Sequence, residues 1–99
     1  MRIDGVYVPG EGFCKTALET EVTNIVVFAG KGTNVVFRVA PLLSAKYGGQ
    51  PENWQKVRGE VVLIAGDGSR YAEVHWAHER TVGRVELKFK RWLDKERLK

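Results

Sequence analysis

Two segments in the second half of the chain alternate between apolar and polar residues, and this pattern limits the fold more than any other feature. The segments are residues 70–76 and 84–92, and a short polar stretch, 77–83, joins them. A period of two is typical of β-strands that bury one face. Strands joined by so short a connection pair antiparallel. Their buried face is predicted to hold Ala72, Val74, Trp76, Val85, Leu87 and Phe89.

A third strand is predicted immediately before this pair. Residues 59–65 are mostly apolar, and residues 66–69 (Gly-Asp-Gly-Ser) form a turn sequence that tolerates positive φ angles. The three strands then form an antiparallel meander with one buried and one solvated face. A β-branched run at 24–28 predicts a further strand, and 33–38 also has strand propensity.

Short helices are expected in the first half of the chain. A Thr-Ala-Leu-Glu capping box predicts a helix over 16–23, and 40–47 predicts another, with a proline in its first turn and two glycines after its end. A further helical turn is expected at 51–54. We therefore predict an α+β fold, in which short N-terminal helices pack on a three- to four-stranded antiparallel sheet, and a single domain over residues 1–99.

The positive charge of the chain is concentrated at its C-terminal end. The formal net charge is +4, and residues 84–99 alone hold seven Lys or Arg against three Asp or Glu. A basic stripe on a small domain favours a polyanionic partner such as nucleic acid, although the same charge can simply form a solvated face. Since no apolar run approaches the roughly 18 residues of a membrane span, no membrane partner is expected.

The sequence contains no pattern typical of a metal site or a bound cofactor. Its single cysteine, Cys14, cannot form an internal disulfide and is expected to be a small buried apolar residue. Metal-ligand spacings such as Cys-x-x-Cys are absent, and the glycines around Lys31 lack the spacing of a phosphate-binding loop. We therefore expect neither a cofactor nor a metal.

The solvated face of the two alternating strands is predicted to carry an unusual set of polar residues. Cleavage of RNA without a metal requires a general base for the ribose 2′-OH, a general acid for the 5′-oxygen and cations for the charged phosphorane. An aromatic ring can also stack an unpaired base. The predicted face supplies all of these groups: Tyr71, Glu73, His75, Arg84, Glu86, Lys88 and Lys90.

These residues also have structural explanations. His75 can satisfy a neighbouring polar group, and Glu86, flanked by cations, can belong to a cross-strand ladder of ion pairs. Arg80, in the loop between the two strands, is either a phosphate contact or a solubilising charge. The residues alone leave these alternatives open.

Four short stretches carry a resemblance to a known family. They are residues 47–49 (Tyr-Gly-Gly), 51–56 (Pro-Glu-Asn-Trp-Gln-Lys), 72–76 (Ala-Glu-Val-His-Trp) and 83–91 (Gly-Arg-Val-Glu-Leu-Lys-Phe-Lys-Arg), and Gly59 belongs to the same pattern. They resemble the C-terminal toxin modules of bacterial polymorphic and contact-dependent inhibition systems, many of which belong to the barnase–EndoU–colicin–RelE-like group of metal-independent ribonucleases. The resemblance implies a helical part packed on a small antiparallel sheet whose open face holds the active site.

Residues and resemblance together predict a toxin-like, metal-independent endoribonuclease that cleaves tRNA or another structured RNA. The resemblance places the histidine of the sheet at His75. The catalytic residues are predicted to be His75, Glu86, Arg84 and Lys88, with His75 and Glu86 as acid and base. Substrate contacts are predicted from Lys31, Tyr71, Glu73, Arg80 and Lys90.

The resemblance also implies partners and a location. The expected substrate is RNA, tRNA foremost, and the expected site of action is the cytoplasm, reached by delivery as part of a larger toxin. A cognate immunity protein is expected to be acidic, because it must match the basic face. The alternatives are a non-catalytic nucleic-acid-binding module and a phage or other protein-interaction module.

Overall fold

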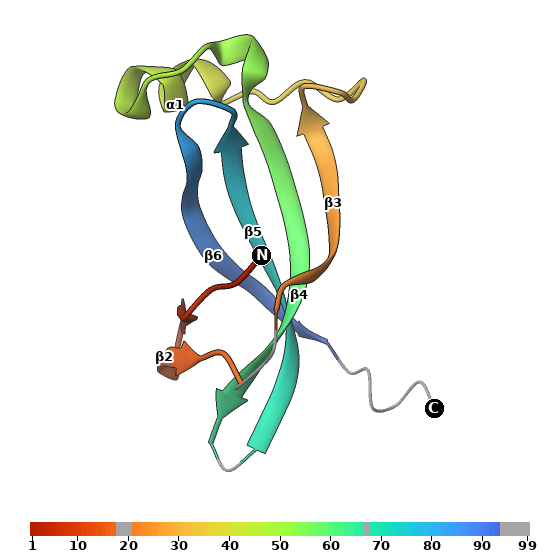
Figure 1. The fold of residues 1–99 in the computed structure, drawn as a ribbon. Coiled ribbons are helices and arrows are strands. Elements are labelled where there is room, and N and C mark those ends of the chain that lie inside the picture. The colour runs from red at the N-terminus through yellow and green to blue at the C-terminus, as the bar shows by residue number, and fades with distance from the viewer. Residues whose placement is uncertain (18–20, 67, 94–99) are drawn as a thin grey trace.

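The computed structural model describes residues 1–17, 21–66 and 68–93, and its main element is a four-stranded antiparallel sheet (Figure 1). Each strand pairs with the next one along the chain, so the sheet is a meander. The strands are β3 (Thr23–Gly30), β4 (Gln55–Ala65), β5 (Gly68–Glu79) and β6 (Gly83–Leu93).

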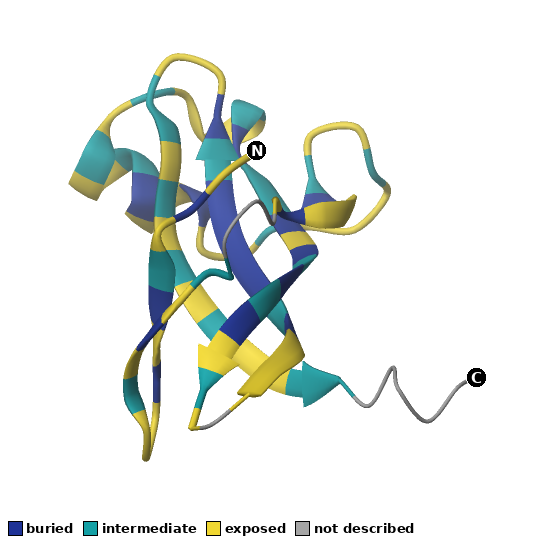
Figure 2. Cartoon of the chain, turned by 60° about the horizontal axis from the view of Figure 1, so that its bottom comes forward, coloured by how far each residue is buried: buried dark blue, intermediate teal, exposed yellow. Residues whose placement is uncertain are grey.

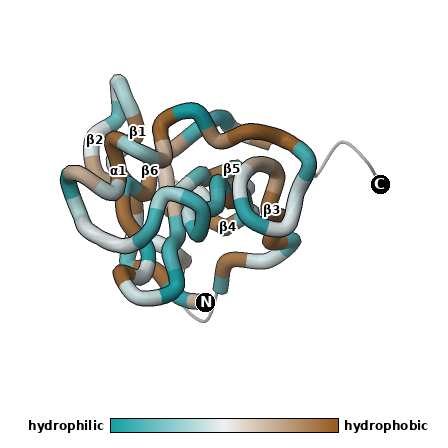
Figure 3. The backbone as a smooth tube through the Cα atoms, turned by 90° about the horizontal axis from the view of Figure 1, so that it is seen from above, coloured by the Kyte–Doolittle hydropathy of each residue, from teal (hydrophilic) through white to brown (hydrophobic). Residues whose placement is uncertain are grey.

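Two smaller units flank this sheet at different ends (Figure 1). The first is a hairpin of β1 (Gly5–Val8) and β2 (Gly12–Lys15). The second lies in the connection between β3 and β4 and consists of helix α1 (Ala40–Tyr47) and the short 3₁₀ helix η1 (Pro51–Asn53). No helix among the described residues is long and apolar enough to cross a membrane. Seen from the helix end, apolar and polar positions are interleaved along the chain (Figure 3).

The main core lies between the sheet and the β1–β2 hairpin. Alternate residues of β4 and β5 point to this side, as their burial pattern shows. The buried residues run along the middle of the sheet, whereas the hairpin turn is exposed (Figure 2). Cys14 is buried here, as predicted. The buried members of the cluster are Ile3, Val6, Val8, Cys14, Val22, Val57, Val61, Leu63, Ala72, Val74 and Trp76.

A second cluster attaches helix α1 to the opposite face of the sheet. Leu43 of the helix packs with Trp54 and Ala77, all of them buried. Ala77 follows Trp76 in β5, so its side chain points away from the main core. The indole Nε1 of Trp54 donates a hydrogen bond of 2.9 Å to the Ser44 hydroxyl, which satisfies its polar group. Helix α1 is therefore held over one end of the face that the hairpin leaves open.

Most of the predicted elements are confirmed, and the fold is α+β with fewer helices than predicted. The alternating segments form β5 and β6, the run at 24–28 lies in β3, and the helix over 40–47 is α1. All four strands of the sheet are longer than predicted, and two differ most. β4 begins at Gln55, four residues before the predicted start, and β5 continues to Glu79.

The predicted N-terminal helix over 16–23 is wrong where the structure describes it. The backbone N–H of Ala17 donates to the carbonyl of Val62, and Thr16 forms a β-bridge with Leu63. Thr23 already belongs to β3, and residues 18–20 lie outside the described residues. Pairing with the end of β4 uses the backbone donors that a helix would need, so tertiary pairing overrides the local capping signal.

Residues 33–38, predicted as a strand, form a loop that connects β3 to α1. The hydroxyl of Thr33 donates to the carbonyl of Gly30 and accepts from the backbone N–H of Val35. A threonine side chain that bonds to nearby backbone groups competes with a sheet ladder for them. The loop is thus folded locally, and it carries Phe37 and Val39 toward α1.

Replacing Gly59 with alanine is expected to destabilise the fold by about 1–3 kcal/mol through overpacking. A Cβ at this buried position of β4 would lie 2.4 Å from Cγ1 of Val22 and 3.1 Å from the Trp76 ring. Gly68 is the matched control, because a Cβ there meets nothing within 4 Å. Urea unfolding of both variants checks the prediction, and equal midpoints for Gly59→Ala and Gly68→Ala would contradict it.

Candidate active site

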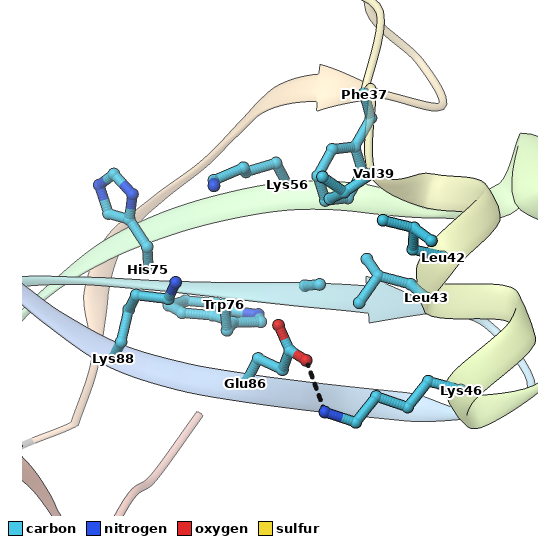
Figure 4. Close-up of a pocket in the computed structure, with 11 residues that line it drawn as sticks. Phe37, Val39, Leu42, Leu43, Lys46, Lys56, His75, Trp76, Glu86 and Lys88 are labelled. Carbon is cyan, nitrogen blue, oxygen red and sulfur yellow. Dashed lines mark ion pairs between the residues drawn. The ribbon is translucent and has the colours of Figure 1, made fainter.

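A pocket of about 320 Å³ lies between helix α1 and the open face of the sheet (Figure 4). One wall comes from the helix and the loop before it, and it is apolar except for Lys46. The sheet provides the other wall, which is charged. The polar residues that line the pocket are Lys46, Lys56, His75, Glu86 and Lys88.

The strand register brings His75 and two cations together. His75 pairs with Lys88 of β6 on one side and with Arg58 of β4 on the other. Residues that pair directly across an antiparallel ladder point to the same face. Lys56, two residues before Arg58, shares that face and also lines the pocket. His75 and Lys88 share one face, as predicted, but His75 is buried there, contrary to the prediction that this face is solvated.

A β-bulge in β6 brings Glu86 into the same pocket. Val85 pairs with Ala77 and Lys88 pairs with His75, so β6 has one more residue than β5 over this interval. Glu86 has a φ angle of 57°, in the left-handed region that residues other than glycine seldom adopt. Strained residues of this kind are concentrated at functional sites.

The carboxylate of Glu86 is held by helix α1. It accepts a hydrogen bond of 2.9 Å from the Tyr47 hydroxyl, and its Oε2 lies 3.5 Å from the ammonium of Lys46 (Figure 4). Interaction with Tyr47, and then with Glu86, raises the pKa of Lys46 above its usual value. Lys46 therefore stays positively charged at neutral pH.

His75 contacts two neighbours, Glu73 and Phe28. Its Nε2 lies 2.5 Å from Oε2 of Glu73, and the side chains of both residues are mostly buried. The ring of Phe28 lies over the imidazole with a centroid distance of 5.1 Å. Arg91 approaches the other oxygen of Glu73, with its Nε at 3.8 Å. A carboxylate partner fixes both the orientation and the proton-bearing nitrogen of an imidazole, so Glu73 is placed to orient His75.

The other predicted site residues lie away from this pocket. Arg84 pairs with His78, so it is on the opposite face from His75, contrary to the prediction. The ammonium of Lys31 donates to Oδ1 of Asn53 instead. Tyr71 shares the face of His75 but lies four residues along β5, roughly 13 Å away at the usual rise of a strand. Arg80 is exposed in the turn between β5 and β6, and Lys90 is exposed at a second irregularity of β6. Neither of these cations lines the pocket.

Several residues of the site were missed by the sequence reasoning. Lys56 and Arg58 were missed because β4 was predicted to begin at residue 59, although Val57, Gly59 and Val61 continue the apolar alternation. This alternation would have placed Lys56 and Arg58 on the face opposite the main core. The ring of Phe28 was missed because the sequence does not show that β3 pairs with β4.

Comparison of the chain with protein-family models, with curated proteins and with solved structures finds no match. The geometry of the pocket is therefore the basis on which a function can be inferred. That geometry combines an imidazole–carboxylate pair, a second carboxylate and three ammonium groups, which come from α1 and three adjacent strands of the sheet.

Proposed function

We propose that this protein is a toxin-like, metal-independent ribonuclease that cleaves tRNA or another structured RNA. The observation that carries the proposal is the pocket in which His75, oriented by Glu73, lies beside Lys88 and Lys56 and opposite the carboxylate of Glu86. These groups are the ones that cleavage by the ribose 2′-OH requires.

In the proposed reaction the 2′-oxygen attacks the phosphorus and the bond from phosphorus to the 5′-oxygen breaks. A general base takes the 2′-OH proton, and a general acid gives a proton to the departing 5′-oxygen. Glu86, as a carboxylate, can accept the first proton, and His75 in its protonated form can supply the second. The products are a 2′,3′-cyclic phosphate and a free 5′-hydroxyl.

The lysines support the charged part of this reaction. The phosphorane gains negative charge as the 2′-oxygen attacks, and preorganised cations at that point lower the barrier. Lys56 and Lys88 line the pocket from the two strands that flank His75. Arg58, paired with His75 but exposed, extends the cationic surface beyond the pocket and fits an RNA backbone.

The biological setting belongs to the same proposal. A ribonuclease of this kind acts where RNA is found, in the cytoplasm, and a toxin reaches it as part of a larger delivery protein. An immunity protein that covers the pocket would be acidic, because it must face Lys46, Lys56 and Lys88.

Incubation of the native protein with total RNA in a buffer containing EDTA tests the proposal. We expect cleavage products that end in 2′,3′-cyclic phosphates, because the nucleophile is the adjacent hydroxyl. Fully 2′-O-methylated RNA is the control, and it should be bound but remain intact. Salt-sensitive binding without cleavage would instead support a non-catalytic nucleic-acid-binding module. Neither binding nor cleavage, with a stable oligomer on a sizing column, would support a protein-interaction module.

A further inference from the structure

The apolar wall of the pocket contains side chains that are exposed to solvent. Leu42 is 70% exposed and Val39 is 44% exposed, although both line the pocket. Phe37 continues this wall, and Leu43 closes its base. An apolar surface beside a polar pocket is typical of a site that binds a ligand with an apolar part.

This wall is held in place before any ligand binds. Leu43 is buried against Ala77 and Trp54, so the side of α1 that faces the sheet is fixed. The hydrogen bond from Trp54 to Ser44 and the contacts of Glu86 with Tyr47 and Lys46 fix the helix from two further directions. A preformed wall costs little ordering on binding.

The opposite wall carries two lysines beside Glu86. The ammonium of Lys56 lies 5.9 Å from the centroid of the Phe37 ring, so a cation and the apolar wall meet inside the pocket. Lys88 extends into the pocket from β6 on the far side of His75 (Figure 4). A ligand that satisfies both walls has a flat apolar group joined to an anionic group, and a nucleotide has this composition.

We propose that the pocket binds one unpaired nucleotide of the RNA, with its base against Phe37, Val39 and Leu42 and its phosphate at Lys56 and Lys88. This inference rests on the proposed function and adds the substrate class. A base in a duplex is stacked on both faces and paired along its edge, so it cannot reach a wall formed by a helix above the sheet. The substrate is therefore a loop or another single-stranded segment.

Fluorescence anisotropy with uncleavable RNA tests this inference. The probes are two fully 2′-O-methylated RNAs with the same number of phosphates, one a hairpin with an unpaired loop and the other a blunt duplex, at one fixed salt concentration. The native protein is expected to bind the hairpin about tenfold more tightly than the duplex. Leu42→Ser should weaken hairpin binding about tenfold and leave duplex binding unchanged, since it removes one apolar contact with the base.

Ile64→Ser is the matched control, because Ile64 is another exposed apolar residue, 47% exposed. It lies eight residues from Lys56 along β4, roughly 26 Å away. Ile64→Ser should bind both RNAs as the native protein does. Equal affinity of the native protein for hairpin and duplex, or unchanged hairpin binding by Leu42→Ser, would overturn the inference.

Two further outcomes distinguish this inference from a site for small nucleotides and from the proposed ribonuclease activity. A free nucleoside monophosphate that competes at the concentration of the hairpin would show a site for small nucleotides and would overturn an RNA loop as the ligand. Because the probes cannot be cleaved, loop preference does not depend on catalysis. A protein that prefers the loop but never cuts RNA would defeat the proposed ribonuclease alone, and one that cuts RNA without loop preference would defeat the inference alone.

Discussion

Replacing His75 with glutamine is expected to reduce RNA cleavage by about 10²- to 10⁴-fold, the usual contribution of a positioned general acid or base. Glutamine retains a polar group beside Glu73 and a side chain under the Phe28 ring, but it cannot exchange a proton at neutral pH. Binding of uncleavable RNA should remain native, because the lysines of the pocket are unchanged. The measurement is the initial rate of cleavage at several pH values, next to the affinity for 2′-O-methyl RNA.

His78→Gln is the matched control for this variant. His78 is the other histidine of the chain, and it pairs with Arg84 on the face opposite His75. We expect native cleavage from His78→Gln. Thermal unfolding should first show that the native protein and His75→Gln are both folded. Equal cleavage rates for the two would then contradict the assignment of His75 as a general acid or base.

Expression in bacteria extends the same comparison to cells. The native chain is expected to stop growth and degrade RNA, whereas His75→Gln should do neither. Growth arrest with intact RNA would defeat the ribonuclease proposal even if the chain is toxic, because the toxicity would then have another cause.

The candidate site could be predicted from the sequence as far as the period of two holds. The alternation around His75 correctly placed Glu73 beside it and predicted Lys88 on the same face. It failed between Val85 and Lys88, where the bulge adds a residue. Val85 consequently packs under helix α1, while Leu87 stays with the main core. The run Val-Glu-Leu-Lys does not mark this bulge, and the residues that hold Glu86 there, Tyr47 and Lys46, are distant in sequence.

The first half of the chain was harder to predict for a different reason. Its capping box was overridden by pairing with β4, which a single sequence does not reveal. The strand propensity of residues 33–38 was overridden by local hydrogen bonds of Thr33. The apolar wall formed by residues 37–43 was missed in the same way. The exposed apolar residues of this short helix line a pocket only together with the sheet on which the helix packs.

Replacing Glu79 with alanine is expected to lower the melting temperature by about 10 °C or more, the largest effect on stability that we expect from a single substitution outside the apolar core. Glu79 is fully buried at the end of β5. Its Oε1 accepts hydrogen bonds from the hydroxyl and backbone N–H of Thr81 and from the N–H of Val82, and its Oε2 accepts from the N–H of Gln50. Removing the carboxylate leaves these donors without their acceptor.

The same hydrogen bonds predict a pH dependence. The bond from the Thr81 hydroxyl, followed by that from the N–H of Gln50, lowers the pKa of Glu79 from 4.5 to about 2. A carboxyl whose pKa is lowered in the folded state stabilises that state fully above pH 4.5, and the contribution disappears as the pH falls toward 2. The difference in melting temperature between the native protein and Glu79→Gln should therefore be largest near neutral pH and shrink over this interval.

Glu11→Gln provides the control for this measurement, because Glu11 is exposed in the turn of the β1–β2 hairpin. Its melting temperature should follow that of the native protein across the same pH range.

Glu79 also connects the end of β5 to Gln50, between α1 and η1, and the chain packs closely here, because a Cβ at Gly49 would lie 2.5 Å from the carboxyl carbon of Glu79. Loss of this tie should loosen the helix that forms the apolar wall, so Glu79→Gln should bind loop RNA more weakly even at temperatures where it is folded. Native loop affinity in a folded Glu79→Gln would show that α1 is held by the Trp54 and Glu86 contacts alone.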